Sequence, residues 1–305
     1  MQHSLPAIVC CLLFDFISNA FEIEPGFPTA CGISAFPRTF KYDATRMKVP
    51  ATPNSWPWHV GLWPQRAGYF PFCGGTLISD SLVVTAAHCV HDAIGCRNTP
   101  FEGLIDMTIT TDSALYVLVG AHDYTTADLS RQLHRLQFVV IHPNFTEKFE
   151  DKGYDIAILK LAHRITPDKT VRPICFPAKH IQLKVGSTCY YAGWGQELTS
   201  WSRGKPVYPK SLREAEVQID YDAHCLRISS YQFADSNTCI YTKGRTPGDG
   251  DSGSGLFFFA GNNHRWFWYG AIESSPPITQ GDYSIVNKVQ AVHEWIKVTA
   301  ISLGL

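Results

Sequence analysis

With 305 residues, 45% of them apolar and 13% aromatic, the chain can bury a substantial hydrophobic core, which excludes a disordered protein. The net charge is -1 and no long run of either sign occurs, so composition does not indicate binding to nucleic acid or to an anionic membrane surface. Beyond the N-terminal segment, no stretch approaches the eighteen or more apolar residues of a membrane span.

The first twenty residues are expected to be a secretory signal peptide. Residues 5–17 are largely apolar, and Ser18-Asn19-Ala20 places small residues at the two positions that a signal peptidase reads. Two features fit less well, because no Lys or Arg precedes the apolar stretch and Asp15 interrupts it. The alternative is an ordinary buried N-terminal segment, but we expect a secreted, extracellular protein.

Residues 21–44, rich in Pro, Gly and Phe, are expected to form a propeptide-like arm ahead of one domain at residues 45–305. Of the ten cysteines, Cys10 and Cys11 lie in the predicted signal peptide, which leaves eight for an oxidising compartment. Neither a Cys-x2-Cys nor a His-x3-His spacing occurs, so we expect no metal site, and no other cofactor is indicated.

Short apolar runs separated by Gly, Pro and Asn predict an all-β protein built as a sandwich or a barrel. Examples are residues 115–119, 138–141, 155–161 and 256–259. Asn144 begins an Asn-Phe-Thr glycosylation sequon in one intervening loop. A helix is expected at the end, because Val289, Val292 and Ile296 recur at three and four residues and Gly304 follows.

Three motifs supply a histidine, a carboxylate and a serine in that order. They are Thr85-Ala86-Ala87-His88-Cys89, the run from Tyr154-Asp155 to Leu161, and Gly250-Asp251-Ser252-Gly253. These residue types have the three roles of nucleophilic acyl transfer: a hydroxyl attacks, an imidazole takes its proton, and a buried carboxylate fixes the tautomer of the imidazole.

The motifs resemble TAAHC, DIALLKL and GDSGGP of the chymotrypsin-like serine proteases, over residues 53–296. The resemblance implies two six-stranded antiparallel β-barrels with the catalytic residues in the cleft between them. It implies that His88 and Asp155 come from the first barrel and Ser252 from the second, and that the N–H groups of Gly250 and Ser252 form the oxyanion hole. A serine endopeptidase acting on protein or peptide substrates is therefore expected, with protein protease inhibitors as further partners.

The resemblance also implies three disulfides. These are Cys31–Cys175, which would tether the arm to the domain, Cys73–Cys89 beside His88, and Cys225–Cys239. Cys96 and Cys189 remain, because Phe258 stands where the family has the partner of Cys189. The two could pair with each other, pair between chains, or stay free.

The family's activation sequence is missing. A mature member begins Ile-Val-Gly-Gly, and the new amino group pairs with the Asp before the nucleophile, here Asp251. Counting back from residues 55–58, the expected N-terminus falls near Thr45, and a cut after Arg46 would leave Met47 roughly 7 Å of extended chain short. The alternatives are a cut at a non-tryptic bond, another group paired with Asp251, or a zymogen-like domain.

The substrate-binding strand also departs from the family pattern. Glu273-Ser274-Ser275 stand in place of Ser-Trp-Gly. Glu273 would lie either beside Asp155, where like charges raise one pKa and perturb His88, or toward solvent through a register shift.

The primary specificity pocket is expected to be reshaped. Gly248 replaces one cysteine of the disulfide that spans this pocket in the family, and residues 275–284 contain no cysteine. Thr246 stands where trypsin-like enzymes have Asp, and Ser284 would narrow the pocket. Asp249 is also counted among the predicted substrate-binding residues. We expect the pocket to accept small or medium apolar side chains of the substrate rather than Arg or Lys.

A catalytically silent homologue, acting as a secreted binding or regulatory module, is the alternative. The presence of His88, Asp155 and Ser252 favours the enzyme, whereas the missing tetrapeptide and Glu273 favour the silent module.

Overall fold

The computed structural model describes residues 21–38, 47–64, 70–95, 103–109, 115–126, 129–146, 153–198, 206–228, 233–274 and 282–305. The predicted signal peptide, the expected cleavage region around Thr45, Cys96 and Ser275 lie outside these residues. Within them, none of the helices has the length and apolar character needed to cross a membrane.

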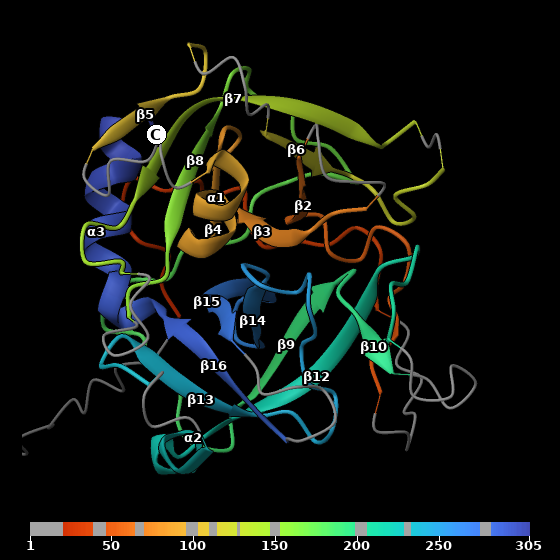
Figure 1. The fold of residues 1–305 in the computed structure, drawn as a ribbon, viewed down its shortest axis with the longest axis vertical. Helices are drawn as coiled ribbons and strands as arrows, with labels where there is room; N and C mark the ends of the chain where they lie inside the picture. Colours follow the sequence, from red (N-terminus) through yellow and green to blue (C-terminus); the bar gives the residue numbers. More distant parts are fainter. Residues whose placement is uncertain are drawn as a thin grey trace, which may run out of the picture.

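The first β-barrel is a closed ring of antiparallel strands, seen in the upper half of Figure 1. Its strands are β2 (His59–Pro64), β3 (Cys73–Leu77), β4 (Leu82–Thr85), β6 (Leu115–Val119), β7 (Gln132–Ile141) and β8 (Ala157–Leu161). Pairing of β7 with β8 closes the ring, and β5 (Leu104–Asp106) extends the edge of β7. Strands β3 and β4 are buried along their whole length, so both faces of each strand are covered.

The second β-barrel closes in the same way, through pairing of β9 with β12. Its strands are β9 (Thr188–Gly193), β12 (Arg213–Asp220), β13 (Asn237–Tyr241), β14 (Gly255–Ala260), β15 (Arg265–Ser274) and β16 (Tyr283–Lys288). Two additions are β1 (Val49–Pro50), which pairs with β12, and a small hairpin of β10 (Glu197–Leu198) and β11 (Pro206–Val207). In β12, Ala215, Val217 and Ile219 are buried and alternate with polar residues, so one face of the strand lies on the core.

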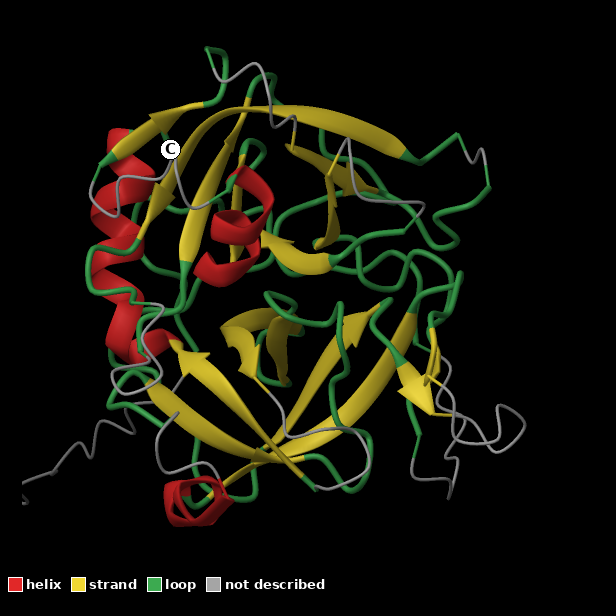
Figure 2. Cartoon of the chain, viewed as in Figure 1, coloured by secondary structure: helices red, strands yellow, loops and turns green. Residues whose placement is uncertain are grey.

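Figure 2 shows one helix along the side of both barrels and another at the lower edge of the second barrel, whereas the third overlaps the first barrel in this view. The helices are α1 (Ala87–Ile94), α2 (Asp222–Ile228) and α3 (Val289–Ser302). The predicted stripe of Val289, Val292 and Ile296 is buried, and α3 contacts β8 of the first barrel as well as β15 and β16 of the second. The expected double-barrel fold with a C-terminal helix is thus confirmed.

All three implied disulfides are present: Cys31–Cys175, Cys73–Cys89 and Cys225–Cys239. The first attaches residues 21–38 to the domain, where Gly32 also exchanges backbone hydrogen bonds with Pro173 and Trp266. Cys189 carries no disulfide within the described part of the chain, and burial raises the pKa of its thiol.

Candidate active site

The pairing of β4 with β8 brings His88 and Asp155 together. Thr85 at the end of β4 lies opposite Ala157 at the start of β8, so the residues just beyond these strand ends meet. His88 Nδ1 lies 2.6 Å from Asp155 Oδ2, and the backbone N–H of His88 donates to Asp155 Oδ1 at 2.8 Å. Both oxygens of the carboxylate therefore hold one residue, and this geometry favours the tautomer with a proton on Nδ1.

The pKa of His88 is raised above its ordinary value of 6.5. Burial acts in the opposite direction and is the largest single influence, but the charge and the hydrogen bond of Asp155 outweigh it. The charges of Asp92 and Glu273 raise the pKa further. The imidazole is therefore a stronger base than a free histidine, because nearby carboxylates stabilise its protonated form.

The Ser252 loop packs against β3 and β4, the two strands that precede His88. The N–H of Gly74 in β3 donates to the backbone oxygen of Ser252 at 2.8 Å. Gly253 has φ of 77°, and a Cβ at this position would lie 2.3 Å from Thr85 Oγ1, so only glycine allows the loop to approach this closely. The loop from the second barrel thus meets the β4–α1 junction of the first.

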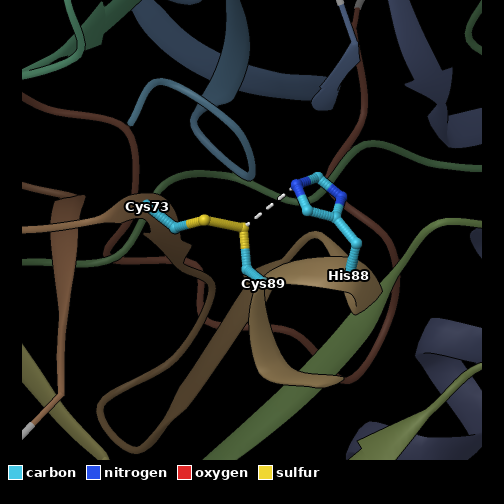
Figure 3. Close-up of side chains that lie close together, drawn as sticks. All are labelled: Cys73, His88 and Cys89. Atoms are coloured by element: carbon cyan, nitrogen blue, oxygen red, sulfur yellow. Dashed lines mark hydrogen bonds between the residues drawn. A yellow bond between two sulfur atoms is a disulfide. The ribbon is translucent and has the colours of Figure 1, made fainter. Parts of the chain in front are cut away.

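Nε2 of His88 lies 3.6 Å from Sγ of Cys89, the contact drawn in Figure 3. No hydrogen bond joins Nε2 to Ser252 Oγ among the residues that the structure describes. In enzymes without substrate, catalytic hydrogen bonds are often long and shorten only when substrate binds. The structure therefore brings His88 and Asp155 into direct contact and places the Ser252 loop beside them.

Cys73, His88 and Cys89 form a cluster of potential metal ligands whose ligand atoms lie within 4.8 Å of one another. Figure 3 shows why the cluster does not suit a metal ion: the two sulfurs are joined in a disulfide, and metal-binding sulfur is thiolate. The disulfide instead attaches the first turn of α1 to β3.

Gly250, one of the two predicted oxyanion-hole residues, has a backbone conformation that favours glycine. Its φ of 96° lies in the region that favours glycine. Within the described residues, the N–H groups of Gly250 and Ser252 make no hydrogen bond to a carbonyl or side chain. Neither donor is therefore occupied by another group in the described part of the chain.

Asp251 is fully buried and pairs with a residue that the sequence analysis missed. Lys48 Nζ lies 2.6 Å from Asp251 Oδ2, and the two side chains are 2% and 0% exposed. Lys48 also donates to the backbone oxygen of Gly195 at 2.8 Å, while the N–H groups of Gly195 and Gly248 donate to the two carboxylate oxygens. A cationic group other than an amino terminus therefore pairs with Asp251, which is one of the three alternatives left open by the missing tetrapeptide.

Glu273 is buried, so the alternative in which it faces solvent is wrong. It is the extra residue of a β-bulge in β15, between Ile272 and Ser274. Its Oε2 accepts hydrogen bonds from the side chains of Asn237 and Asn287, a cross-strand pair of β13 and β16. Neither asparagine was identified from the sequence, since no motif marks them.

The remaining predicted binding residues differ in their burial. Thr246 is buried with its hydroxyl 2.9 Å from that of Thr242, and Ser284 is buried in β16. The Asp249 side chain is exposed, and its backbone oxygen accepts from the N–H of Gln196. Ser274 ends β15.

Comparison with known proteins gives one family and two informative relatives. The family model described as Trypsin matches residues 47–296. Ovochymase of Halocynthia roretzi is 28% identical over 295 residues, which cover 94% of this chain and 17% of that protein. Suppressor of tumorigenicity 14 protein homolog of Bos taurus is 28% identical over 248 residues, which cover 80% of this chain and 26% of that protein. This chain thus aligns with only a small part of either relative, but since the family model spans most of it, the chain belongs to the trypsin family of serine-type endopeptidases.

Proposed function

We propose that the protein is a secreted endopeptidase that hydrolyses peptide bonds through an acyl-enzyme on Ser252. The observation that carries the proposal is the contact between His88 and Asp155, in which the carboxylate holds Nδ1 and leaves Nε2 to act as the base. The three disulfides support secretion, because such bonds persist in oxidising compartments.

In the proposed reaction, Ser252 Oγ attacks the carbonyl carbon of the scissile bond, and its proton passes to Nε2 of His88. The N–H groups of Gly250 and Ser252 donate to the oxyanion that forms, a contribution of about 3 kcal/mol for each donor. His88 then gives the proton to the leaving nitrogen as the C–N bond breaks. Water attacks the acyl-enzyme by the same route, with His88 again taking a proton, and regenerates Ser252.

The primary specificity is proposed to be non-tryptic. Thr246 stands at the position where a trypsin-like enzyme has a carboxylate, and its buried hydroxyl contacts Thr242. A neutral hydroxyl does not compensate the desolvation of an Arg or Lys side chain. Small or medium apolar side chains are the proposed substrates, with Ser284 reducing the space.

The silent-homologue alternative is less well supported. An unpaired Asp251 would favour it, whereas the carboxylate here has a buried cation and two backbone donors.

Glycosylation at Asn144 remains a prediction for an exposed residue.

The test is labelling of the purified, secreted protein with a fluorophosphonate, in which a reactive serine displaces fluoride from phosphorus. Labelling should disappear in Ser252→Ala and persist in Ser254→Ala. Ser254 is a matched control because it lies buried in the same loop and its Oγ has no hydrogen-bond partner among the described residues. Failure of the unaltered protein to react would favour the silent module. Peptide substrates that differ only in the residue before the scissile bond then test the specificity.

A further inference from the structure

We propose that the ammonium group of Lys48 takes the place of the amino terminus that cleavage creates in the family. In the uncleaved chain it would hold the loop that carries Gly250 and Ser252 in its catalytic conformation. This inference rests on the proposed endopeptidase function. It assigns to Lys48 a positioning role through Asp251, with no direct contact with substrate.

The first step is electrostatic. The ion pair is almost completely removed from water, with the two side chains 2% and 0% exposed. A carboxylate buried to this extent is stable only with a cation and full hydrogen bonding. Lys48 supplies the cation, and the backbone N–H groups of Gly195 and Gly248 supply the remaining donors.

The second step concerns the space around the carboxylate. A Cβ at Gly193 would lie 2.1 Å from Asp251 Oδ1, and a Cβ at Gly195 would lie 2.3 Å from Asp251 Cγ. The carboxylate therefore packs directly against the backbone of Gly193 and Gly195, where no other residue type would leave room for it. This packing and the three polar contacts from Lys48, Gly195 and Gly248 together fix the position of the carboxylate.

The third step leads from the carboxylate to the oxyanion donors. Asp251 lies between Gly250 and Ser252, whose N–H groups are the proposed donors. Its own N–H donates to the oxygen of Gly248 at 2.8 Å, and its oxygen accepts from Ser254 at 3.0 Å. With its side chain anchored by Lys48 and its backbone in this turn, residue 251 orients the adjoining peptide group that carries the N–H of Ser252, and the bond from its own N–H to Gly248 fixes the turn that contains Gly250.

The fourth step explains how Lys48 reaches this position without a free chain end. It directly precedes β1, where Val49 pairs with Glu214 of β12, and the N–H of Ala51 donates to the oxygen of Leu212. From this fixed strand, a flexible four-carbon side chain carries the ammonium group to Asp251. The amino terminus that pairs with this Asp in the family exists only after the activation bond is cut, whereas a lysine side chain is available as soon as the chain folds.

The experiment compares uncleaved and cleaved protein. The full chain carrying Arg46→Gln, which removes the tryptic bond after residue 46, is purified, and its intact mass is verified before fluorophosphonate labelling is timed. We expect the uncleaved chain to react within about threefold of the rate of processed protein. In the same background, Lys48→Met should lower the maximal labelling rate by about 10²–10³-fold, the effect of losing an oxyanion donor, with little change in reagent affinity.

Further variants separate positioning from folding. Lys48→Arg retains a cation and should recover part of the rate, and Lys48→Gln retains a donor without charge and should not. The control is Lys297→Met. It removes a lysine of α3 that pairs with Glu24, and it should leave the labelling rate unchanged. Thermal unfolding of each variant shows whether it is folded, and the uncleaved-chain measurement needs no change at Lys48.

The outcomes distinguish the two proposals. If only cleaved protein reacts, the role of Lys48 is overturned and the endopeptidase function stands. Equal rates for Lys48→Met and the unaltered residue in the uncleaved chain would also overturn it. If neither uncleaved nor cleaved protein reacts, both proposals fail.

Discussion

Asn287 donates a hydrogen bond to Glu273, with Nδ2 of the asparagine 2.7 Å from Oε2 of the glutamate. The same nitrogen lies 3.1 Å from the backbone oxygen of Asp155. Glu273 is thereby connected to the residue that orients His88, and its charge adds to that of Asp155 in raising the pKa of the imidazole. A second carboxylate near the base should change the pH dependence of the reaction.

Glu273→Gln should move the acid limb of the pH–rate profile to lower pH. His88 must be neutral to accept a proton, so the rate falls as pH drops through its pKa, which lies above 6.5 here. Removing one nearby negative charge lowers that pKa. The profile is measured from labelling rates or kcat/KM across pH 5–9. Glu216→Gln is the control, since Glu216 lies on β12 with Tyr190 as its partner and is not among the charges that shift His88. An unchanged acid limb in Glu273→Gln would contradict the coupling.

The features that could be predicted from the sequence are those written in contiguous motifs. The helix with its Val289, Val292 and Ile296 stripe follows from local periodicity, whereas the double barrel and the three disulfides follow from the family resemblance that the short motifs carry; all are confirmed. The ion pair of Lys48 and Asp251 could not be predicted in this way, because it joins residues 203 positions apart. It depends on how β1 docks on β12, and no local pattern records that docking.

The orientation of Glu273 shows a second limit. Strand alternation leaves two faces open to a residue, and a bulge changes which face it takes. Both alternatives were therefore reasonable from the sequence. The bulge directs the side chain toward Asn237 and Asn287. Their side-chain amides donate hydrogen bonds to the carboxylate, which offset the free energy lost when the carboxylate is removed from water.

Arg38→Met should destabilise the protein by about 3–5 kcal/mol, the loss expected when one partner of a buried ion pair is removed. Arg38 binds Glu214 through two nitrogens, and the side chains are 8% and 5% exposed. Its guanidinium group also lies over aromatic rings of Trp56, Tyr190 and Trp266. The measurement is the free energy of unfolding in urea. Arg164→Met is the matched control: its pair with Asp80 is 61% and 30% exposed, so a change below about 1 kcal/mol is expected. Equal effects of the two substitutions would rule out a special role for burial.

Gly195→Ala should disturb the Asp251 site and lower stability by about 1–3 kcal/mol, the usual cost of overpacking. The new methyl carbon would lie 2.3 Å from Asp251 Cγ and 2.5 Å from its backbone nitrogen, where neither atom can move freely. Labelling of Ser252 should fall at the same time, because the carboxylate that orients the loop is displaced. Gly261→Ala is the control, since no atom lies within 4 Å of a Cβ there, and it should change the unfolding free energy by no more than about 0.5 kcal/mol. Normal stability and labelling in Gly195→Ala would contradict the proposed packing.

Acid should destabilise the folded protein through His59. Burial, with a smaller contribution from the charge of Lys48, lowers the pKa of His59 from 6.5 to about 3. Between these values the unfolded chain binds a proton that the folded chain does not, so stability is complete above pH 6.5 and falls as pH drops toward 3. At pH 4.5 the loss from this group is about 2–3 kcal/mol, from 1.36 kcal/mol per pH unit. His142, whose pKa burial lowers to about 4, acts in the same direction.

The measurement for His59 is the urea-unfolding free energy at intervals from pH 8 to pH 4. His59→Gln should flatten the curve over this interval, because glutamine has no proton to bind in the unfolded state. His88, whose pKa is raised, affects stability in the opposite direction. Its contribution to the free energy of unfolding is present below pH 6.5 and is lost as pH rises through the pKa of the folded state, so His88 does not cause the loss of stability below pH 6.5. A His59→Gln curve as steep as that of the unaltered protein would assign the acid sensitivity to His142 or to carboxylates instead. His59 packs against Trp194, with ring centroids 5.0 Å apart, so the variant should also lose some stability at every pH, and only the slope is diagnostic.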